Sequence, residues 1–343
     1  MPRKAIRFLS LGCTLATLLA LTSAWASPEK GWLIPILGLT IPILLAVNLL
    51  FALGWLFLRD WAFFTSFACL LVALWLYPGL LGTNFREAPV TTPSFRVLSY
   101  NLHYLQEVLL RPGEEQAKAF ESFFNFFNSV GEVNFLCVQE TSSDSYRPIA
   151  EHLGYPHYFG NKGTMIFSRV PFLDKGFIDF GKTTNSCTWV DVLLDGKRIR
   201  LYSLHLESSH ISSPTDYLAK QKDIDRRSLR AMKHIFRNYK NASKIRVQQA
   251  RLVIENINAC PYPVILCGDF NEPPTSFVYR QFSKILKDSF REKGLGLGTT
   301  FAGNLPLLRI DYLFFDKKIA VQSHKVLHAN FSDHYPVVCQ FSF

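Results

Sequence analysis

The distribution of hydrophobic and polar residues divides the chain into two parts. Three stretches near the N-terminus contain no charged side chain, at residues 8–25, 32–58 and 61–81. Each is at least as long as the ~18 residues expected of a candidate membrane-spanning helix. A buried helical hairpin of a water-soluble protein is a poor alternative, because stretches 32–58 and 61–81 would leave it no polar face. The pattern therefore predicts a transmembrane region of three spans at residues 1–83.

The first stretch also fits a signal peptide. Residues 1–26 combine a basic start, an apolar core and, at 24–26, the small-x-small sequence at which such a peptide is cleaved. Arg3, Lys4 and Arg7 favour a cytoplasmic N-terminus, because positive charges tend to stay inside. Under either interpretation the rest of the chain lies in the periplasm or on the external face. We therefore expect a multi-pass membrane protein with an extracytoplasmic globular part.

Beyond residue 83 the pattern changes. Residues 84–94 include two prolines and several polar residues, which is typical of a linker. From residue 95 to residue 343, short apolar runs alternate with helical windows. The expected strands are 95–100, 133–138, 164–167, 188–194, 199–206, 264–267, 311–315 and 337–343. The expected helices are 114–130 and 219–257. This alternation predicts a layered α/β domain.

Basic residues are unevenly spread along the chain. The whole sequence has 37 basic and 27 acidic residues, and the window 220–246 supplies much of the basic excess. The rest of the globular domain is nearly balanced, so net charge does not argue for nucleic-acid binding. The window is either a solvated helix face or a surface that contacts anionic lipid headgroups.

Polar residues suited to phosphate chemistry lie at the ends of the expected strands. Asp269 and Asn271 follow one apolar run and point the same way from an extended chain. Asp333 and His334 precede another run and add a second acid and a candidate general acid or base. Such groups can activate a water molecule and hold a divalent cation beside a phosphate.

More polar residues occupy equivalent positions at other strand ends. These are Asn101, Glu140, His205 and Asp311. One such residue alone is normally a turn or cap residue. Because strand ends converge on one edge of a sheet, we expect the whole set to share a cleft.

Six short strings carry a family resemblance. They are Tyr100-Asn101, Val138–Glu140, Ser203–Leu206, Gly268–Asn271, Arg309–Tyr312 and Ser332–His334. In this order they resemble the signature of the endonuclease/exonuclease/phosphatase superfamily, whose members share the fold of pancreatic deoxyribonuclease. The resemblance covers residues 95–343. It implies a four-layer α/β sandwich, with two packed mixed β-sheets flanked by helices, here in a membrane-anchored bacterial type.

The resemblance implies a role for each matched residue. Glu140, together with Asn101 and Asp333, would bind Mg²⁺ or Mn²⁺ through oxygen atoms. Asp269 would orient or deprotonate the attacking water. Asn271 would hold that water or a phosphoryl oxygen.

The remaining matched residues would act on the phosphate itself. His334, hydrogen-bonded to Asp311, would stabilise the transition state or protonate the leaving oxygen, because a neighbouring carboxylate favours the protonated imidazole. His205 would donate to a non-bridging oxygen, and Arg309 is expected to bind the substrate. Some DNA-repair members carry an acid two residues after the first Asn. This chain has His103 there, so a second metal ligand of the repair type is not expected.

These observations predict a membrane-anchored, Mg²⁺-dependent phosphoesterase. The reaction would be attack of a metal-positioned water on a phosphodiester or phosphomonoester. A lipid or membrane-associated substrate is favoured, because a tether raises the effective concentration near the bilayer. The alternatives are a surface-anchored nuclease acting on DNA or RNA and a non-catalytic scaffold.

Overall fold

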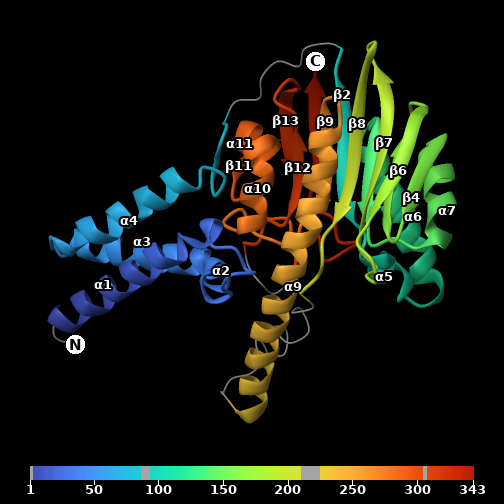
Figure 1. Cartoon of the computed structure of the whole chain (residues 1–343). Coiled ribbons are helices and arrows are strands. Elements are labelled where there is room, and N and C mark those ends of the chain that lie inside the picture. The colour runs from blue at the N-terminus through green and yellow to red at the C-terminus, as the bar shows by residue number, and fades with distance from the viewer. Residues whose placement is uncertain (1–2, 86–92, 210–224, 304–306) are drawn as a thin grey trace.

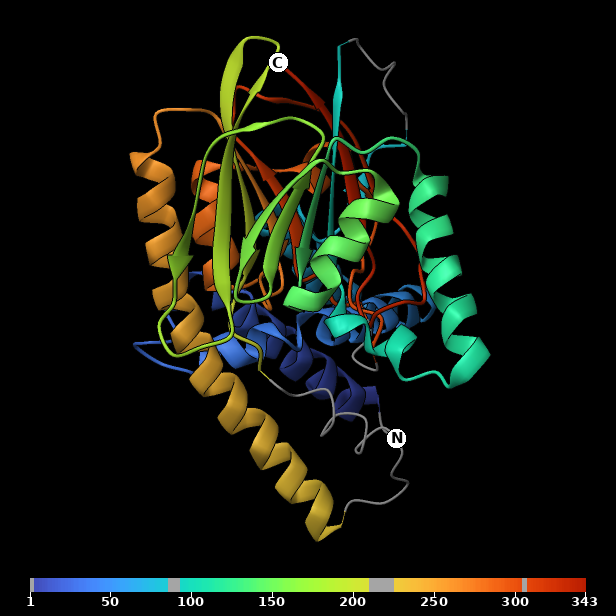
Figure 2. The same ribbon diagram turned by 90° about the vertical axis from the view of Figure 1, so that its right-hand side faces the viewer.

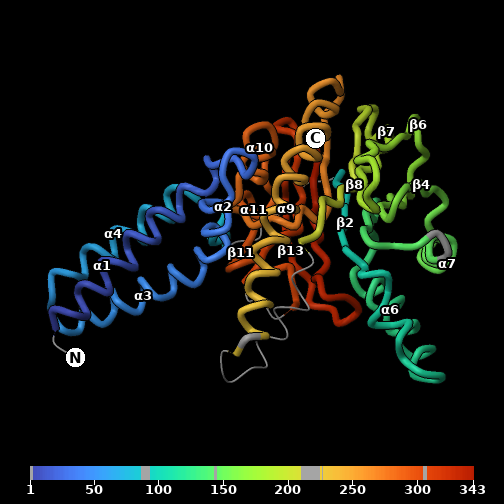
Figure 3. Tube along the Cα trace, turned by 60° about the horizontal axis from the view of Figure 1, so that its bottom comes forward, coloured from blue at the N-terminus to red at the C-terminus, as the bar shows by residue number. Residues whose placement is uncertain are grey.

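The computed structural model describes residues 3–85, 93–209, 225–303 and 307–343. An N-terminal bundle of helices projects from one side of a larger sandwich of strands and helices (Figure 1). The view in Figure 3 shows the same separation, with the short helix α2 (Leu33–Gly38) on the side of the bundle that meets the sandwich.

Two six-stranded sheets form the centre of the sandwich. The first sheet has the order β10 (Lys287–Asp288), β12 (Asp311–Phe315), β9 (Val264–Asp269), β8 (Lys197–His205), β7 (Ser186–Leu194), β6 (Phe172–Asp179). The second has the order β13 (Ala320–Val326), β14 (Val337–Ser342), β2 (Phe95–Asn101), β3 (Phe135–Gln139), β5 (Thr164–Ser168), β4 (His157–Asn161). The pairs β2–β3 and β8–β9 are parallel and the other pairs are antiparallel, so both sheets are mixed.

Helices cover the outer faces of both sheets. The helices α6 (Gly113–Val130) and α7 (Ser143–Leu153) pack against the sheet that contains β2 and β3. The long helix α9 (Arg226–Ala259) and α10 (Phe277–Ile285) pack against the other sheet. Figure 2 shows α9 and α6 on opposite sides of the strands. The predicted four-layer α/β sandwich is therefore confirmed.

The central strands are continuous apolar runs because their successive side chains point into two different apolar cores. In β9, Ile265 and Cys267 lie in the core between the two sheets, whereas Val264 and Leu266 lie in the core beneath α9 and α10. A strand that is buried on both faces carries apolar residues at every position. All seven cysteines of the chain have free thiols.

The bundle contains α1 (Arg3–Ala20), α2, α3 (Ile41–Phe57) and α4 (Ala62–Leu76). Among the described residues, one helical segment, Arg3–Trp25, is long and apolar enough to cross a membrane. The predicted span 32–58 is divided into α2 and α3. Pro42 lies in the first turn of α3, where its missing N–H leaves no carbonyl unpaired.

The bundle buries polar residues and exposes large apolar ones. Asn48 is fully buried, donates to Thr17 Oγ1 (2.8 Å) and accepts from Thr14 Oγ1 (3.0 Å). Its exposed residues include Phe8, Leu15, Leu50, Phe57, Phe64 and Trp75. The bundle also has a small buried apolar cluster that includes Leu21, Ile41 and Tyr77.

The bundle and the sandwich share backbone and side-chain hydrogen bonds. Ser23 Oγ donates to the carbonyl of Thr275 (2.8 Å). The short strand β1 (Gly82–Thr83) pairs with β11 (Leu295–Gly296). The predicted linker 84–94 follows directly, and its residues 86–92 lie outside the described part of the chain.

Candidate active site

All of the predicted site residues except Arg309 meet at one edge of the sandwich. Asn101, His205 and Asp269 end β2, β8 and β9, and Glu140 directly follows β3. Parallel strands end at the same edge, which brings these side chains together. Strand register adds Asp311 at the start of β12, because its Cα pairs with that of Asp269.

Asp269 lies at the centre of this group. Its Oδ1 accepts the backbone N–H of Asn271 (2.8 Å), and its Oδ2 accepts the side-chain amides of Asn101 (3.0 Å) and Asn271 (3.2 Å). Burial raises the pKa of this carboxyl to about 6, although the nearby imidazole of His334 works in the opposite direction. A carboxylate with a pKa near neutrality is suited to accept a proton from water.

His334 and Asp311 form the predicted hydrogen-bonded pair. The His334 Nδ1 lies 2.9 Å from Asp311 Oδ2. Burial alone would lower the pKa of His334, but the carboxylates of Asp311 and Asp269 outweigh burial and raise it to about 10. These carboxylates therefore favour the protonated imidazole at neutral pH. Its Nε2 is 3.8 Å from Asp269 Oδ2, so a proton donor and a proton acceptor face each other.

Glu140, His205 and Asp269 form a group that could hold a metal ion. Their candidate ligand atoms all lie within 4.8 Å of one another, as do those of Asp269, Asp311 and His334. The carboxylate oxygens of Glu140 and Asp269 fit a hard divalent cation. The Nε2 of His205 is buried without a hydrogen-bond partner and lies 3.5 Å from Glu140 Oε1. An unpartnered buried nitrogen is unfavourable, which points to a ligand at this position.

Asn101 holds the two carboxylates in place. Its amide nitrogen donates to Glu140 Oε1 (3.0 Å) as well as to Asp269, and its Oδ1 accepts the N–H of His103 (3.0 Å). Burial would raise the pKa of Glu140, but the imidazole of His205 and the Asn101 amide more than compensate and lower it. Because the amide oxygen faces His103, this arrangement makes Asn101 an orienting residue. Direct ligation by Asn101 stays a prediction.

Asp333 lies at the rim of the group. Its side chain is 29% exposed, and its Oδ1 is 4.0 Å from His334 Nε2 and 3.6 Å from His103 Nδ1. Neither group of candidate metal ligands found among the described residues includes it. Its predicted role as a ligand therefore stays a prediction, and His103 occupies the position next to it.

Arg309 lies apart from the group. It is buried, its Nη1 donates to Asp288 Oδ2 (2.9 Å) and its Nη2 donates to the carbonyl of Gly79 (2.9 Å). These contacts commit the guanidinium to the junction between the bundle and the sandwich. Arg309 therefore lies at this junction and outside the group around Asp269, and its expected role in substrate binding stays a prediction.

Two hydroxyl groups, to which the sequence assigned no positioning role, fix the backbone of the site. Thr300 Oγ1 accepts the N–H groups of Ile310 (3.0 Å) and Asp311 (3.1 Å). Ser332 Oγ donates to the carbonyl of Asn101 (2.7 Å) and accepts the N–H of His334 (3.2 Å). Ser332 lies within a matched string, whereas no sequence signal marked Thr300 as a residue that positions Asp311.

The backbone near the site adopts conformations that non-glycine residues rarely use. Glu140 has φ +48° and Asn271 has φ +51°, and the three consecutive residues His103–Leu105 also have positive φ. Such strain concentrates at functional sites, where the surrounding structure enforces it. Here it directs Glu140 and Asn271 toward Asp269.

Residues 98–334 match the endonuclease/exonuclease/phosphatase family. The chain belongs to this family and is a phosphoesterase hydrolase. Residues 3–79 match a domain of unknown function (DUF8431). A search of curated proteins finds no match.

Solved structures support the fold. An endonuclease/exonuclease/phosphatase family protein from Bacteroides thetaiotaomicron is 20% identical, with a TM-score of 0.55 over 74% of this chain and 99% of that chain. A mannosyl-6-phosphatase from the same organism is 19% identical, with a TM-score of 0.52 over 73% and 100%. A humanized D. rerio TDP2 is 17% identical, with a TM-score of 0.51 over 73% and 99%. At these identities the likeness extends to the fold alone.

Proposed function

We propose that the protein is a membrane-anchored phosphoesterase that uses Mg²⁺ or Mn²⁺ to hydrolyse a phosphate ester of a lipid or another membrane-associated molecule. The observation that carries the proposal is the placement of Asp269. It lies between the protonated imidazole of His334 and the possible metal ligands Glu140 and His205.

The residues divide the proton transfers of the reaction between them. Asp269 accepts a proton from water as the water oxygen bonds to phosphorus, with Asn271 orienting the carboxylate. His334 donates a proton to the leaving oxygen as its bond to phosphorus breaks, and Asp311 holds the imidazole. The unpartnered Nε2 of His205 is available to a non-bridging oxygen. A divalent ion held by Glu140, with Asn101 and Asp333 as the further predicted ligands, would neutralise phosphate charge when bound.

The bundle supports the membrane anchor. Its outward apolar and inward polar side chains are those expected when lipid surrounds the helices. The ion pairs of Arg3 and Arg7 with Asp60 lie at the end far from the sandwich (Figure 1). Basic residues at that end favour a cytoplasmic location, which would leave the sandwich in the periplasm or on the external face.

Contacts within the bundle support retention of the first span over cleavage as a signal peptide. Arg7 donates to Asp60 (2.7 Å), Ser10 Oγ lies 3.2 Å from Ser66 Oγ and accepts from Trp55 Nε1 (3.1 Å). Removal of residues 1–26 would leave these partners unsatisfied inside the bundle.

An apolar cavity supports a lipid substrate. It has a volume of about 140 Å³ and lies between the start of α3 and the loops that follow Asn271 and precede Asp311. Its lining is mostly apolar and includes Leu39, Pro42, Leu45, Leu80, Pro273 and Leu308, with Arg309 as the one charged residue among the described lining residues. A hydrocarbon chain in this cavity would link the bundle to the loops that carry the catalytic side chains.

The basic window also supports membrane contact. Arg230, Lys233 and Arg237 of α9 are exposed together with the apolar residues Leu229, Met232 and Phe236, as in a helix that lies at a bilayer surface. Arg246 belongs to a different environment, because it is fully buried and paired with Glu272 (2.7 Å). Residues 220–224 of the window lie outside the described part of the chain.

A substrate panel tests the proposal. The full chain in detergent and in vesicles is assayed with bis-p-nitrophenyl phosphate, sphingomyelin, phosphoinositides, DNA and RNA, with Mg²⁺ or Mn²⁺. We expect the highest rates on a membrane substrate. Asp269→Asn and His334→Ala should each lower turnover by at least ~100-fold, because each removes a proton-transfer group. The exposed turn residue Asp195→Asn is the matched control and should keep full activity.

Other outcomes of the panel would contradict the proposal. Faster cleavage of DNA or RNA, lost in Asp269→Asn, would favour the surface nuclease. The absence of turnover on every phosphate ester would favour a non-catalytic scaffold. Unchanged rates in both site variants would refute the assigned mechanism.

A further inference from the structure

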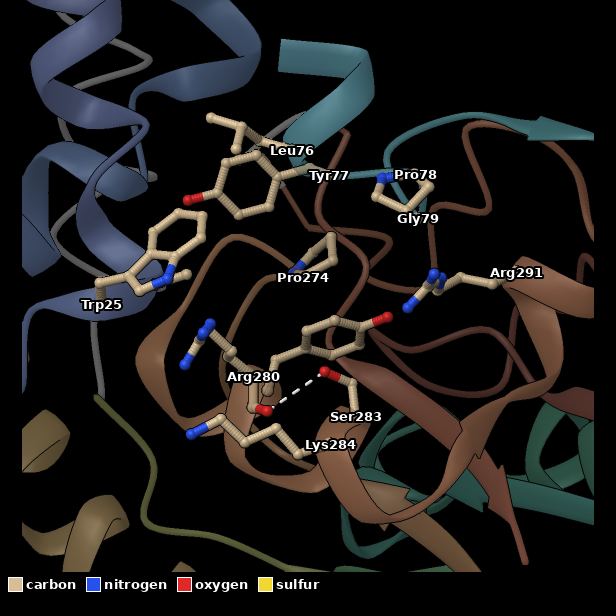
Figure 4. Close-up of a pocket in the computed structure, with 12 residues that line it drawn as sticks. Trp25, Leu76, Tyr77, Pro78, Gly79, Pro274, Arg280, Ser283, Lys284 and Arg291 are labelled. Atoms are coloured by element: carbon tan, nitrogen blue, oxygen red, sulfur yellow. Dashed lines mark hydrogen bonds between the residues drawn. The ribbon is translucent and has the colours of Figure 1, made fainter. Parts of the chain in front are cut away.

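A second pocket lies where the bundle meets the sandwich. We call it the junction pocket. Its volume is about 190 Å³, and its lining includes Trp25, Tyr77, Arg280, Ser283, Lys284 and Arg291 (Figure 4). It contains none of the residues of the candidate active site.

The two halves of the protein each supply one wall. Trp25 ends the short 3₁₀ helix Ser23–Trp25, which follows α1, and Tyr77 directly follows α4. Arg280 and Lys284 come from α10, and Arg291 comes from α11 (Ser289–Lys293). Trp25 is 47% exposed. Trp and Tyr are typical of the level at which a membrane gives way to water, so the pocket would open at the headgroup layer.

The sandwich wall of the pocket is positively charged. Figure 4 shows Arg280 and Arg291 on opposite sides of the pocket, with Lys284 below Arg280. None of the described residues that line it is acidic. Within the described part of the chain, none of these three cations has a carboxylate within ion-pair distance. Asp288, between α10 and α11, is already paired with Arg309 (2.9 Å).

One of the cations packs on an aromatic side chain of the opposite wall. The guanidinium of Arg280 lies 5.0 Å from the centre of the Trp25 ring, over its face. Ser283 Oγ donates to the carbonyl of Arg280 (3.2 Å), which Figure 4 marks with a dashed line. Arginine side chains bind phosphate oxygens in pairs of charge-assisted hydrogen bonds, and a neighbouring lysine adds a point charge.

We infer that the junction pocket binds the phosphate of an anionic membrane-lipid headgroup. The bound lipid bridges α10 and α11 to the ends of the bundle helices and so fixes the orientation of the sandwich on the membrane. The site is separate from the catalytic one. The inference rests on the proposed membrane embedding of the bundle and is independent of the proposed reaction.

Binding measurements on the detergent-solubilised full chain test the inference. The probes are dihexanoyl phosphatidic acid, dihexanoyl phosphatidylcholine and inorganic phosphate. We expect phosphatidic acid to bind most tightly. The double variant Lys284→Gln/Arg291→Gln should weaken that binding by at least ~10-fold, because two charge-assisted contacts are lost. Both residues are exposed, so the variant should fold normally.

A matched control separates the pocket from general charge effects. Lys317→Gln/Lys318→Gln removes the same number of charges from an exposed turn that follows β12 and should bind phosphatidic acid as the unmodified chain does. Equal affinity in the pocket variant and the control would overturn the inference. Inorganic phosphate that binds as tightly as phosphatidic acid would overturn the assignment to a lipid.

Failure of this inference is distinguishable from failure of the membrane proposal. If carbonate washing releases the full chain from membranes, the proposed embedding is wrong, and the inference falls with it. If the chain stays in membranes and the pocket variant binds phosphatidic acid normally, only the junction-pocket site is refuted.

Discussion

The two oxygens of Asp269 have different surroundings, and this difference defines how the site works. Oδ1 accepts the backbone N–H of Asn271, whereas Oδ2 receives two side-chain amides and faces the imidazole of His334. The positive φ of Asn271 returns its backbone N–H and its amide to the same carboxylate. One residue thus restrains both oxygens, which favours a fixed direction for proton transfer.

The charge of His334 provides a prediction at this scale. Asp311→Asn removes the largest influence that raises the pKa of His334, so the lowering effect of burial should prevail. Activity that needs a protonated imidazole is retained below its pKa, about 10, and lost as pH rises through it. In the variant this alkaline limb should move to lower pH, with a fall in kcat at neutral pH. The measurement is kcat/KM against pH. If the fall in activity at alkaline pH does not shift in the variant, this fall reports the titration of a group other than His334.

Gly268 provides a second prediction. It has φ +146°, and an added Cβ would lie 1.9 Å from the carbonyl oxygen of Leu204 on the neighbouring strand. Gly268→Ala should therefore destabilise the sandwich by at least ~4 kcal/mol or prevent folding. The control Gly196→Ala also has a positive φ, +75°, but meets no atom within 4 Å. It should lose only ~1 kcal/mol, as measured by denaturant unfolding. Equal losses of stability in the two variants would show that the positive φ, and not the contact with Leu204, causes the destabilisation.

The sequence predicted which side chains lie together, because strand-end position and residue type are both visible in the chain. It did not predict the direction of individual side chains. Arg309 lies two residues before Asp311, but its guanidinium binds Asp288 and therefore points away from the site. Arg309 and Asp288 are 21 residues apart in the sequence, and neither matched string indicates that they are in contact. The orientation of the Asn101 amide likewise depends on the N–H of His103, which is placed by a left-handed backbone.

At the scale of elements, the unpredicted strands share a location. β4, β6 and β13 each lie at the edge of a sheet. Edge strands face solvent on more sides, so their apolar pattern is weaker than that of central strands. In β6 most side chains are exposed or half-buried. The central strands β2, β9 and β12 were predicted because both of their faces are buried.

The amphipathic part of α9 carries a prediction of its own. Reversing Arg226, Arg227 and Arg230 to Glu should reduce contact with anionic lipid, because each basic residue near such a surface contributes ~1 kcal/mol. Hydrogen exchange of α9 is measured on the full chain in phosphatidylglycerol and in phosphatidylcholine vesicles. We expect protection of α9 to be greater in phosphatidylglycerol, and the variant to lose the difference. Equal exchange in both lipids for the unmodified chain would indicate a solvated helix face.

At the scale of the whole molecule, a buried histidine links stability to pH. His324 belongs to β13, and its Nδ1 lies 2.8 Å from Ser289 Oγ at the start of α11. Burial lowers its pKa from 6.5 to about 4, although Asp288 works in the opposite direction. Between these values the unfolded chain binds a proton that the folded chain does not. Stability is therefore full above pH ~6.5 and falls as pH decreases toward ~4.

This linkage gives the last prediction. The free energy of unfolding should fall by at most ~3 kcal/mol between pH ~6.5 and ~4. The variant His324→Gln should show a smaller dependence of this free energy on pH. Exposed His328→Gln is the control and should retain it. Chemical unfolding at a series of pH values provides the measurement. The same slope in the His324 variant and the control would show that other groups dominate.

The hydrogen bond from Arg309 to the carbonyl of Gly79 has a consequence for how such proteins are assembled. The donor belongs to one half of the chain and the acceptor to the other, while Asp288 balances the charge between them. The bundle and the sandwich therefore cannot each be exchanged for that of another protein without loss of this contact. A chimaera that joined this bundle to the sandwich of another relative would need an arginine and a carboxylate at the corresponding positions to keep the contact. We therefore expect the bundle and the sandwich to be inherited together, as one unit.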